Sequence, residues 1–305
     1  MFRKRKKHLG LDIGGAAVRL AIVSPGRKPT AEKLSKLPVP PGAVENGRIL
    51  DPEALGFAIK SELGPWEGDL FTTIKAAGSG IALRFFKLPL LKKGELEEAV
   101  KFESENVLPF RLSEVFWDYE VYKARDHLEV LVAAAEKQTV EQNLAVLSAA
   151  GITPQAVELG PLALVRVLRR QLEGETAAVL ELGDFYWELT IFSSGRPVFF
   201  RLLPGAPQAD LRSAAGGEVP VSLGELVQDL RRSFDFIGRE RNEQVDKLLL
   251  AGYGAAVPEL AAFFEGQLGL EAVLGDPFGL VRNKSGQTSP EFAVALGLAL
   301  RGVRP

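Results

Sequence analysis

Residues 9–24 have the sequence LGLDIGGAAVRLAIVS, in which two strand-like apolar runs flank a glycine turn. Residues 177–203, AAVLELGDFYWELTIFSSGRPVFFRLL, repeat this order and add a Ser-Gly turn and a third strand. Short apolar runs joined by glycine-containing turns are typical of β-hairpins. Two similar hairpins in distant parts of one chain predict a duplicated architecture with two lobes.

Helical segments alternate with the strand-like runs over the rest of the chain. The pattern predicts helices over 51–63, 95–107, 138–150, 161–172, 223–241, 258–268 and 291–300, and a hairpin over 117–122 and 129–135. Asp51 is a candidate N-cap, Pro52 suits the first helical turn, and Gly151 suits a helix C-terminus. This alternation favours an α/β protein.

The composition narrows the class of protein. The 305 residues include 37 Lys and Arg against 39 Asp and Glu, so the net charge is −2 and a protein that coats nucleic acid is not expected. The absence of cysteine excludes a disulfide scaffold, thiolate zinc sites and a cysteine nucleophile. Hydrophobic residues make up 46% of the chain and charged residues 25%, which is typical of a globular protein with a sizeable core.

Three glycine turns carry the candidate nucleotide chemistry. They are Asp12-Ile13-Gly14-Gly15, Glu181-Leu182-Gly183-Asp184 and Gly252-Tyr253-Gly254. The backbone N–H groups of such a turn can face a phosphate, while a short carboxylate can hold Mg²⁺ or its waters. A single Asp-x-Gly turn is more often only a hairpin turn. Two hairpins of this kind, one in each lobe, followed by a third glycine turn are the layout of an actin-type nucleotide cleft.

Four ordered blocks of the sequence resemble one family. They are residues 11–23 (LDIGGAAVRLAIV), 84–122 with its Leu-Pro, acidic helix and Pro-Phe, 129–158 with its Ala-Gly-Ile-x-Pro, and 248–278 with its Gly-Asp-Pro-Phe. The blocks are similar to those of the type IV pilus assembly PilM family, which belongs to the actin-like superfamily together with the division protein FtsA. The resemblance covers nearly the whole chain.

The resemblance implies a two-lobed actin-like (ribonuclease H-like) α/β fold with an inserted subdomain of the 1C type. Lobe 1, which is 1A-like, is expected to comprise residues 1–79 and 156–176 and a C-terminal helix over 290–305. The inserted subdomain is expected at 80–155, and lobe 2, which is 2A/2B-like, at 177–289.

The resemblance also implies a role in type IV pilus assembly and twitching motility. A protein of this family is expected in the cytoplasm at the periphery of the inner membrane. There it binds the N-terminal cytoplasmic peptide of a PilN-type bitopic membrane protein, in a groove between 1A and 1C. Membrane association is then indirect, and pilus motor or platform proteins are further candidate partners. The candidate walls of the partner groove are Arg84, Leu88, Phe102, Val107 and Phe110.

The same resemblance implies ATP and Mg²⁺ as cofactors, with Asp12 as the residue that meets Mg²⁺. The candidate cofactor-binding residues are Asp12, Gly14, Gly15, Glu181, Gly183, Gly252 and Gly254. No residue stands out as catalytic. The first turn departs from the family pattern, because Gly15, Ala16 and Ala17 stand where hydroxyl residues usually follow the Asp-x-Gly.

The second turn departs further from the pattern. Glu181 replaces an aspartate, and Phe185, Tyr186 and Trp187 replace small hydroxyl residues. These substitutions predict weakened ATP binding, and efficient ATP hydrolysis is not expected. Strand alternation places either Phe185 and Trp187 or Tyr186 and Glu188 toward the cleft, and the sequence leaves both choices open.

Other functions fit the same superfamily fold. An active ATP-binding and ATP-hydrolysing protein of the FtsA type, or a sugar-kinase relative, would be an enzyme, and the hydroxyl-poor turns argue against it. A component of a type II secretion system or of a DNA-uptake system would share both the fold and the mode of partner binding. The sequence separates this last class from pilus assembly only poorly.

Overall fold

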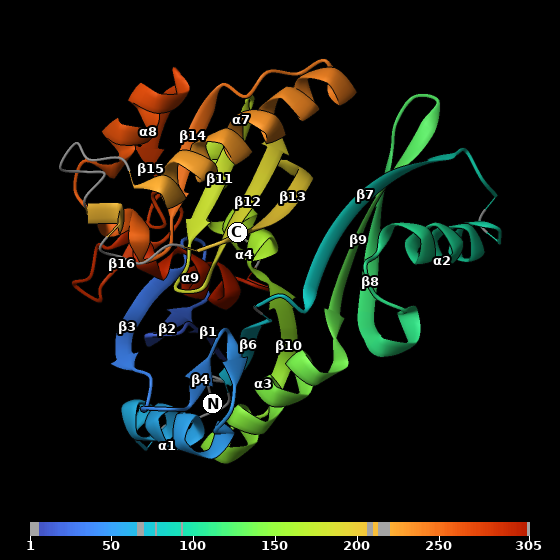
Figure 1. Ribbon diagram of the computed structural model, residues 1–305. Coiled ribbons are helices and arrows are strands. Elements are labelled where there is room, and N and C mark those ends of the chain that lie inside the picture. The colour runs from blue at the N-terminus through green and yellow to red at the C-terminus, as the bar shows by residue number, and fades with distance from the viewer. Residues whose placement is uncertain are drawn as a thin grey trace.

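The computed structural model describes residues 6–65, 70–76, 78–92, 94–205, 210–212 and 220–303. Parts of the predicted ranges 1–79, 80–155, 177–289 and 290–305 lie outside these residues. Two large sheets form the body of the molecule, and a smaller sheet stands to one side of them (Figure 1).

The first large sheet has six strands in the order β10-β6-β1-β2-β3-β16. Its strands are β1 (Lys7–Ile13), β2 (Ala17–Ser24), β3 (Thr30–Pro38), β6 (Leu70–Ala76), β10 (Pro154–Leu159) and β16 (Arg282–Asn283). The second has five strands in the order β13-β12-β11-β14-β15. Its strands are β11 (Thr176–Leu182), β12 (Tyr186–Ser193), β13 (Arg196–Pro204), β14 (Lys247–Ala251) and β15 (Glu271–Leu274).

The centres of the two large sheets have the same topology, which confirms the predicted duplication. In the first sheet β1 pairs antiparallel with β2 and parallel with β6, and β2 pairs antiparallel with β3. In the second sheet β11 pairs antiparallel with β12 and parallel with β14, and β12 pairs antiparallel with β13. The two glycine turns of the sequence therefore occupy equivalent places, one in each sheet.

The third sheet has three strands in the order β7-β9-β8 and belongs to a separate outer layer. Its strands are β7 (Ile81–Pro89), β8 (Val115–Lys123) and β9 (His127–Glu136), and the helix α2 (Leu96–Val107) packs on its outer face (Figure 1). The predicted hairpin over 117–122 and 129–135 is confirmed as β8 and β9. Because β8 is an edge strand, one side of it is unpaired within its sheet.

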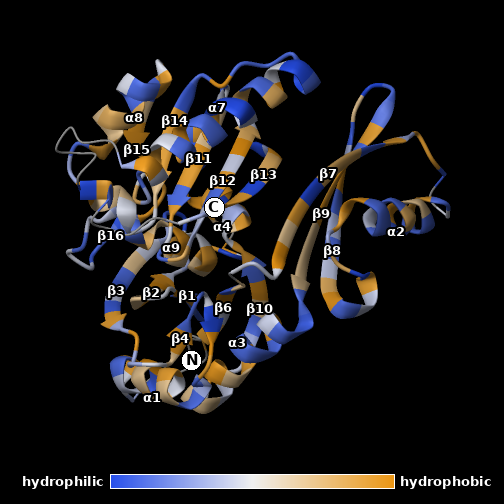
Figure 2. Ribbon diagram, viewed as in Figure 1, coloured by the Kyte–Doolittle hydropathy of each residue, from blue (hydrophilic) through white to orange (hydrophobic). Residues whose placement is uncertain are grey.

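Helices cover both faces of each large sheet. The helices α1 (Pro52–Leu63) and α3 (Lys137–Ala150) pack on one face of the first sheet, and α7 (Val221–Arg241) and α8 (Leu260–Leu268) pack on one face of the second. Between the two sheets lie α4 (Gly160–Val167) and α9 (Ala293–Ala299), which share one apolar core with both. The central strands are accordingly apolar over most of their length (Figure 2).

Local signals in the sequence set the helix ends. The Asp51 carboxylate accepts a hydrogen bond from the backbone N–H of Ala54 at 2.9 Å, and Gly151 ends α3 with a φ of 73°. The predicted helix over 161–172 is interrupted, because Leu168 leaves the helical conformation and separates α4 from the short helix α5 (Arg169–Leu172). Short elements complete the chain: β4 (Val44–Glu45), β5 (Arg48–Ile49), and the 3-10 turns η1 (Leu112–Glu114), η2 (Gly254–Ala256) and η3 (Pro290–Phe292).

Gly10 permits the close approach of α9 to β1. A Cβ atom added at Gly10 would lie 2.0 Å from the carbonyl oxygen of Ala295 and 2.6 Å from the backbone nitrogen of Ala299. Both atoms belong to the helix backbone, so a side-chain rotation cannot relieve the clash. We expect Gly10→Ala to lower the free energy of unfolding by about 1–3 kcal/mol, the usual cost of overpacking a core.

Urea denaturation of Gly10→Ala measures this cost, with Gly224→Ala as the control. A Cβ at Gly224, inside α7, meets no heavy atom within 4 Å, so alanine there should stabilise the helix by up to about 1 kcal/mol. Equal stability of Gly10→Ala and the wild type would contradict the packing described for β1 and α9.

Candidate functional site

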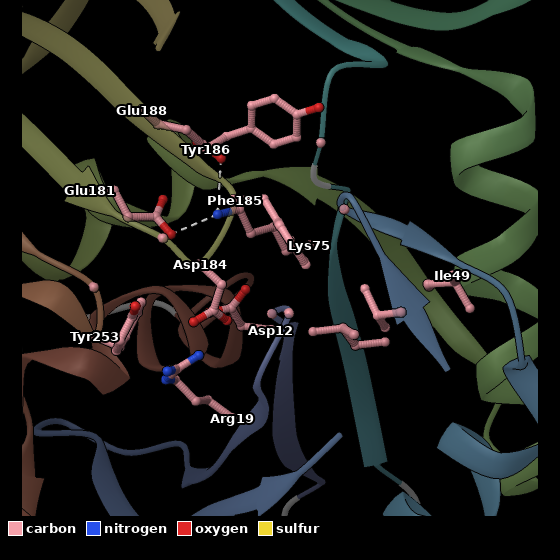
Figure 3. Close-up of a pocket in the computed structure, with 18 of the residues that line it drawn as sticks. Asp12, Arg19, Ile49, Lys75, Glu181, Asp184, Phe185, Tyr186, Glu188 and Tyr253 are labelled. Atoms are coloured by element: carbon pink, nitrogen blue, oxygen red, sulfur yellow. Dashed lines mark hydrogen bonds and ion pairs between the residues drawn. The ribbon is translucent and has the colours of Figure 1, made fainter. Parts of the chain in front are cut away.

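The two glycine turns face each other across one cleft between the large sheets (Figure 3). The cleft also receives Tyr253 and the β4–β5 turn at Gly47. Of the predicted nucleotide residues, the structure brings together in its lining Asp12, Gly14, Gly15, Glu181, Gly183 and Gly252. Gly254 lies behind this lining, where an added Cβ would be 2.7 Å from the Leu182 side chain.

A buried ion cluster joins the two lobes at the floor of the cleft. The Lys75 ammonium from β6 lies 2.7 Å from Glu181 Oε1 of β11 and 3.0 Å from Glu188 Oε1 of β12. The three side chains are only 5–6% exposed. Asp12, from β1, is close enough to contribute electrostatically. The cluster therefore ties a strand of the first sheet to two strands of the second.

The charges of this cluster shift the pKa of both kinds of group. Burial alone would lower the pKa of Lys75, but attraction to Glu181, Glu188 and Asp12 raises it above its ordinary value, so Lys75 stays charged. Burial, opposed by Lys75 and reinforced by Glu188 and Asp12, raises the pKa of Glu181 to about 8. One ammonium group thus lies among three carboxyl groups, and one of these, Glu181, holds a proton near neutral pH.

The second oxygens of Glu181 and Glu188 point to the start of α4. Both Oε2 atoms are buried and have no hydrogen-bond partner among the residues the structure describes. A Cβ added at Gly160, the first residue of α4, would lie 2.9 Å from Glu181 Oε2 and 2.7 Å from Glu188 Oε2. The absence of a side chain at Gly160 leaves room for both oxygens.

The turn between β11 and β12 reaches across the cleft into the turn between β1 and β2. The Asp184 carboxylate accepts a hydrogen bond from the backbone N–H of Ala16 at 3.0 Å. The Phe185 ring lies against Gly15, where an added Cβ would be 2.2 Å from ring carbon Cε2. About 70 Å³ of the cleft remains open. An acidic side chain and an aromatic ring of the chain itself therefore fill the first glycine turn.

The aromatic run of the second turn divides between the cleft and the core. Phe185 and Tyr186 line the cleft together with Glu188, whereas Trp187 is 1% exposed in the core of the second lobe. Strand alternation begins only at Tyr186, so of the two alternatives the pair Tyr186 and Glu188 faces the cleft. Phe185 also faces it because Phe185 belongs to the turn and not to the strand.

Sequence reasoning did not place Lys75 and Arg19 in the cleft, and it gave Glu188 only as part of one of two alternatives. Lys75, Glu188 and Arg19 each lie in an apolar strand, and that placement was the available signal, because a charge in such a strand needs a partner. Arg19 pairs with Glu291 at 3.2 Å and stacks over the Tyr253 ring, with its guanidinium carbon 5.5 Å from the ring centroid. The partners come from distant parts of the chain and could not be identified from one strand.

The predicted walls of the partner groove lie around the outer sheet and α2. Leu88 is buried among the residues that α2 packs against, and Val107 and Phe110 pack around Val115 on the same side. Arg84 is half-buried, and Phe102 is 65% exposed on α2. The structure therefore groups these residues at one face of the sheet, with Phe102 as the most accessible.

Comparison with solved structures establishes the class of fold. A structure described as the PilM-PilN type IV pilus biogenesis complex matches with a TM-score of 0.84 and 29% identity, over 99% of this chain and 100% of that chain. EutJ of Carboxydothermus hydrogenoformans matches with a TM-score of 0.53 and 14% identity, over 97% and 89% of the two chains. The cytoplasmic domain of EpsL, an inner-membrane component of the type II secretion system of Vibrio cholerae, matches with a TM-score of 0.53 and 12% identity, over 97% of this chain and 96% of that chain. The last two show the fold alone.

The fold is the two-lobed actin-like α/β fold with an inserted subdomain, as the sequence predicted. The sequence itself matches the family described as type IV pilus assembly protein PilM over residues 10–204 and 222–303. The chain belongs to this family, which confirms the resemblance found in the four sequence blocks. Among the helices that the structure describes, none has the length and apolar character needed to cross a membrane.

The raised pKa of Glu181 predicts a pH-dependent contribution to stability. The ordinary pKa of a glutamate is 4.5 and that of Glu181 in the folded chain is about 8, so between these values the folded chain holds a proton that the unfolded chain releases. The contribution of Glu181 is present at low pH and is lost as the pH rises toward 8. We expect Glu181→Gln, which cannot titrate, to lose less stability than the wild type over this range.

Urea denaturation at a series of pH values between about 5 and 8 measures this difference. Glu98→Gln, at an exposed carboxyl group on α2, is the matched control and should follow the wild type. An unchanged pH dependence in Glu181→Gln would show that Glu181 is ionised throughout the range.

Proposed function

We propose that this chain is a scaffold of the type IV pilus assembly platform that binds the N-terminal cytoplasmic segment of a PilN-type membrane protein. The observation that carries the proposal is an apolar groove flanked by two strands that are both at the edges of their sheets. One is β8 of the outer sheet, and the other is β10 of the first large sheet. The match to a PilM-PilN complex over the whole chain supports the kind of partner.

The groove has a volume of about 280 Å³ and an apolar floor. Most of its residues come from β8, β9 and β10, with Val140 of α3 and Leu162 of α4, and they include Phe116, Ala133, Val157 and Leu159. Phe116 is 52% exposed, so its ring is accessible to a partner. Asp118 adds negative charge at the rim, whereas Glu158 is buried and pairs with Arg301 at 2.6 Å and with Arg166 at 2.7 Å.

An extended peptide suits this groove for a simple reason. An edge strand presents unpaired N–H and C=O groups, and a peptide that lies beside it gains main-chain hydrogen bonds. Alternate side chains of the peptide can then enter the apolar floor. The groove lies on the face of the outer sheet opposite Leu88 and α2. We therefore propose that the peptide lies at the β8 edge and not at the walls predicted from the sequence.

We infer further that the cleft does not hold ATP and Mg²⁺, the groups that the fold family implies. The Asp184 carboxylate already uses the Ala16 N–H that would face a phosphate, and Phe185 covers Gly15. The Lys75 ammonium pairs with Glu181 and Glu188 and also attracts the carboxylate of Asp12, the residue that would meet Mg²⁺. The open volume of about 70 Å³ is well below the ~300 Å³ of a small ligand site. These observations support a scaffold that works without ATP hydrolysis.

Association with the inner membrane follows from the proposed partner. A bitopic partner is anchored in the membrane by its own helix, so the scaffold needs no spanning segment of its own. In this proposal the chain lies on the cytoplasmic side and is held at the membrane through the peptide in the β8–β10 groove.

Calorimetric titration with a synthetic peptide tests the proposal. The peptide is the N-terminal cytoplasmic segment of the PilN-type protein from the same organism. We expect Phe116→Ala to weaken binding by about tenfold, because a buried aromatic contact contributes more than about 1 kcal/mol at an interface.

Two matched variants locate the site. Phe57→Ala, at a phenylalanine that is 73% exposed on α1, should bind the peptide as the wild type does. Phe102→Ala weakens binding only if the groove follows the predicted walls near α2. No binding of the peptide to the wild-type chain would refute the proposed function.

A further inference from the structure

A second large cavity lies at the far ends of the hairpins from the cleft. β2 runs from the cleft to a turn at 25–29, and β12 runs from the cleft to a turn at 194–195, so these two turns lie a strand length away from the glycine turns. Both turns line the cavity, together with α4, α5, residues 280–282 and the C-terminal Leu300 and Val303. Its volume is about 1060 Å³, and we call it the basic pocket.

The lining of the basic pocket is strongly cationic. Arg166 forms an ion pair with Glu158 at 2.7 Å, and Arg169 forms one with Glu173 at 3.3 Å. Among the residues that the structure describes, Glu173 is the one carboxylate in the lining. Five further cations line the pocket without an ion pair to any carboxylate of the described residues: Arg27, Lys28, Arg170, Arg282 and Arg196, the last with its guanidinium carbon 4.8 Å from the centroid of the Tyr122 ring.

This concentration of charge is a local feature. The chain as a whole has a net charge of −2, so the positive potential of the pocket does not reflect a basic protein. Arg27, Lys28, Arg170 and Arg282 are exposed, and like charges around a concave surface repel one another unless an anion lies between them. The apolar side chains of Val165, Leu280 and Leu300 add a nonpolar floor.

We propose that the basic pocket binds a free small molecule that carries two or more phosphate groups. Guanidinium groups match phosphate oxygens in pairs, and several of them line one open concave pocket here. The volume suits a ligand of nucleotide size, and the concave shape suits a molecule that enters the pocket better than a flat membrane surface. The proposal does not depend on the PilN-type partner or on the state of the cleft.

A bound ligand would connect the two lobes. Arg27 and Lys28 belong to the β2–β3 turn of the first sheet, and Arg196 belongs to the start of β13 in the second. An anion between these cations favours the arrangement of lobes in which they converge, because a ligand stabilises the conformation to which it binds more tightly. The ligand would therefore act at the side of the lobes opposite Lys75.

Calorimetric titration with sodium tripolyphosphate, in buffer without divalent metal, tests the proposal. We expect binding to the wild-type chain that weakens as NaCl is raised, because salt screens these exposed charges. Arg170→Glu/Arg282→Glu should weaken binding by about tenfold or more, since repulsion replaces two charge-assisted contacts. Arg170→Gln/Arg282→Gln, which removes the charges without reversing them, should show a smaller loss in the same direction.

The control is Lys60→Glu/Lys101→Glu, which makes the same change in net charge at exposed residues of α1 and α2. This variant should bind tripolyphosphate as the wild type does. An equal loss of affinity for tripolyphosphate in the control and in Arg170→Glu/Arg282→Glu would overturn the proposal. The anion would then be attracted by the net charge of the chain and not by the basic pocket. No binding to the wild type would overturn it as well.

Cosedimentation with phosphatidylglycerol vesicles separates a free ligand from a lipid surface. We expect the wild type and Arg170→Glu/Arg282→Glu to sediment equally with the vesicles. Sedimentation that depends on Arg170 and Arg282, in a chain that does not bind tripolyphosphate, would show that the pocket binds a lipid surface and not a free molecule. That result would contradict the proposal.

Discussion

One buried ammonium group fixes how the two lobes of this protein meet. Lys75 leaves the first sheet and is held by Glu181 and Glu188 of the second, so three strands from two lobes share one ion cluster. Removal of a partner from a buried ion pair typically costs about 3–5 kcal/mol, because the remaining charge is left without compensation. The position of the β11–β12 turn, and therefore the closure of the cleft, depends on this cluster.

In the proposed scaffold, side chains of the chain itself take positions that phosphate and Mg²⁺ would occupy in the cleft. Lys75 supplies the positive charge between the carboxylates, Asp184 supplies the acceptor for the Ala16 N–H, and Phe185 fills the space over Gly15. A ligand shifts a conformational equilibrium only through a difference in affinity between two states. Lys75, Asp184 and Phe185 belong to the chain itself, so their contacts are present at every nucleotide concentration. In the proposed scaffold they therefore favour one arrangement of the lobes whether or not nucleotide is present.

The sequence predicted the fold well because its signals are local. The repeated glycine hairpins, the Asp51 cap and the Gly151 helix end each depend on neighbouring residues, and the structure confirms them. The partners of Lys75 could not be predicted in this way. The alternation of apolar residues predicts the face of the strand on which Lys75 lies, but not which strands of the other sheet lie opposite that face. The β8–β10 groove escaped prediction for the same reason, because β8 and β10 are edge strands of different sheets.

Titration of Mg·ATP into the Arg170→Glu/Arg282→Glu variant tests most directly whether the chain's own residues close the cleft. This variant is expected to weaken binding of phosphate groups at the proposed basic pocket, so heat that persists at the wild-type affinity reports on the cleft. We expect no binding tighter than about 100 µM, which corresponds to roughly −5.5 kcal/mol. Binding of Mg·ATP with a Kd below about 100 µM would show that Asp184 and Phe185 leave the first glycine turn, and it would refute a cleft closed by the chain's own residues.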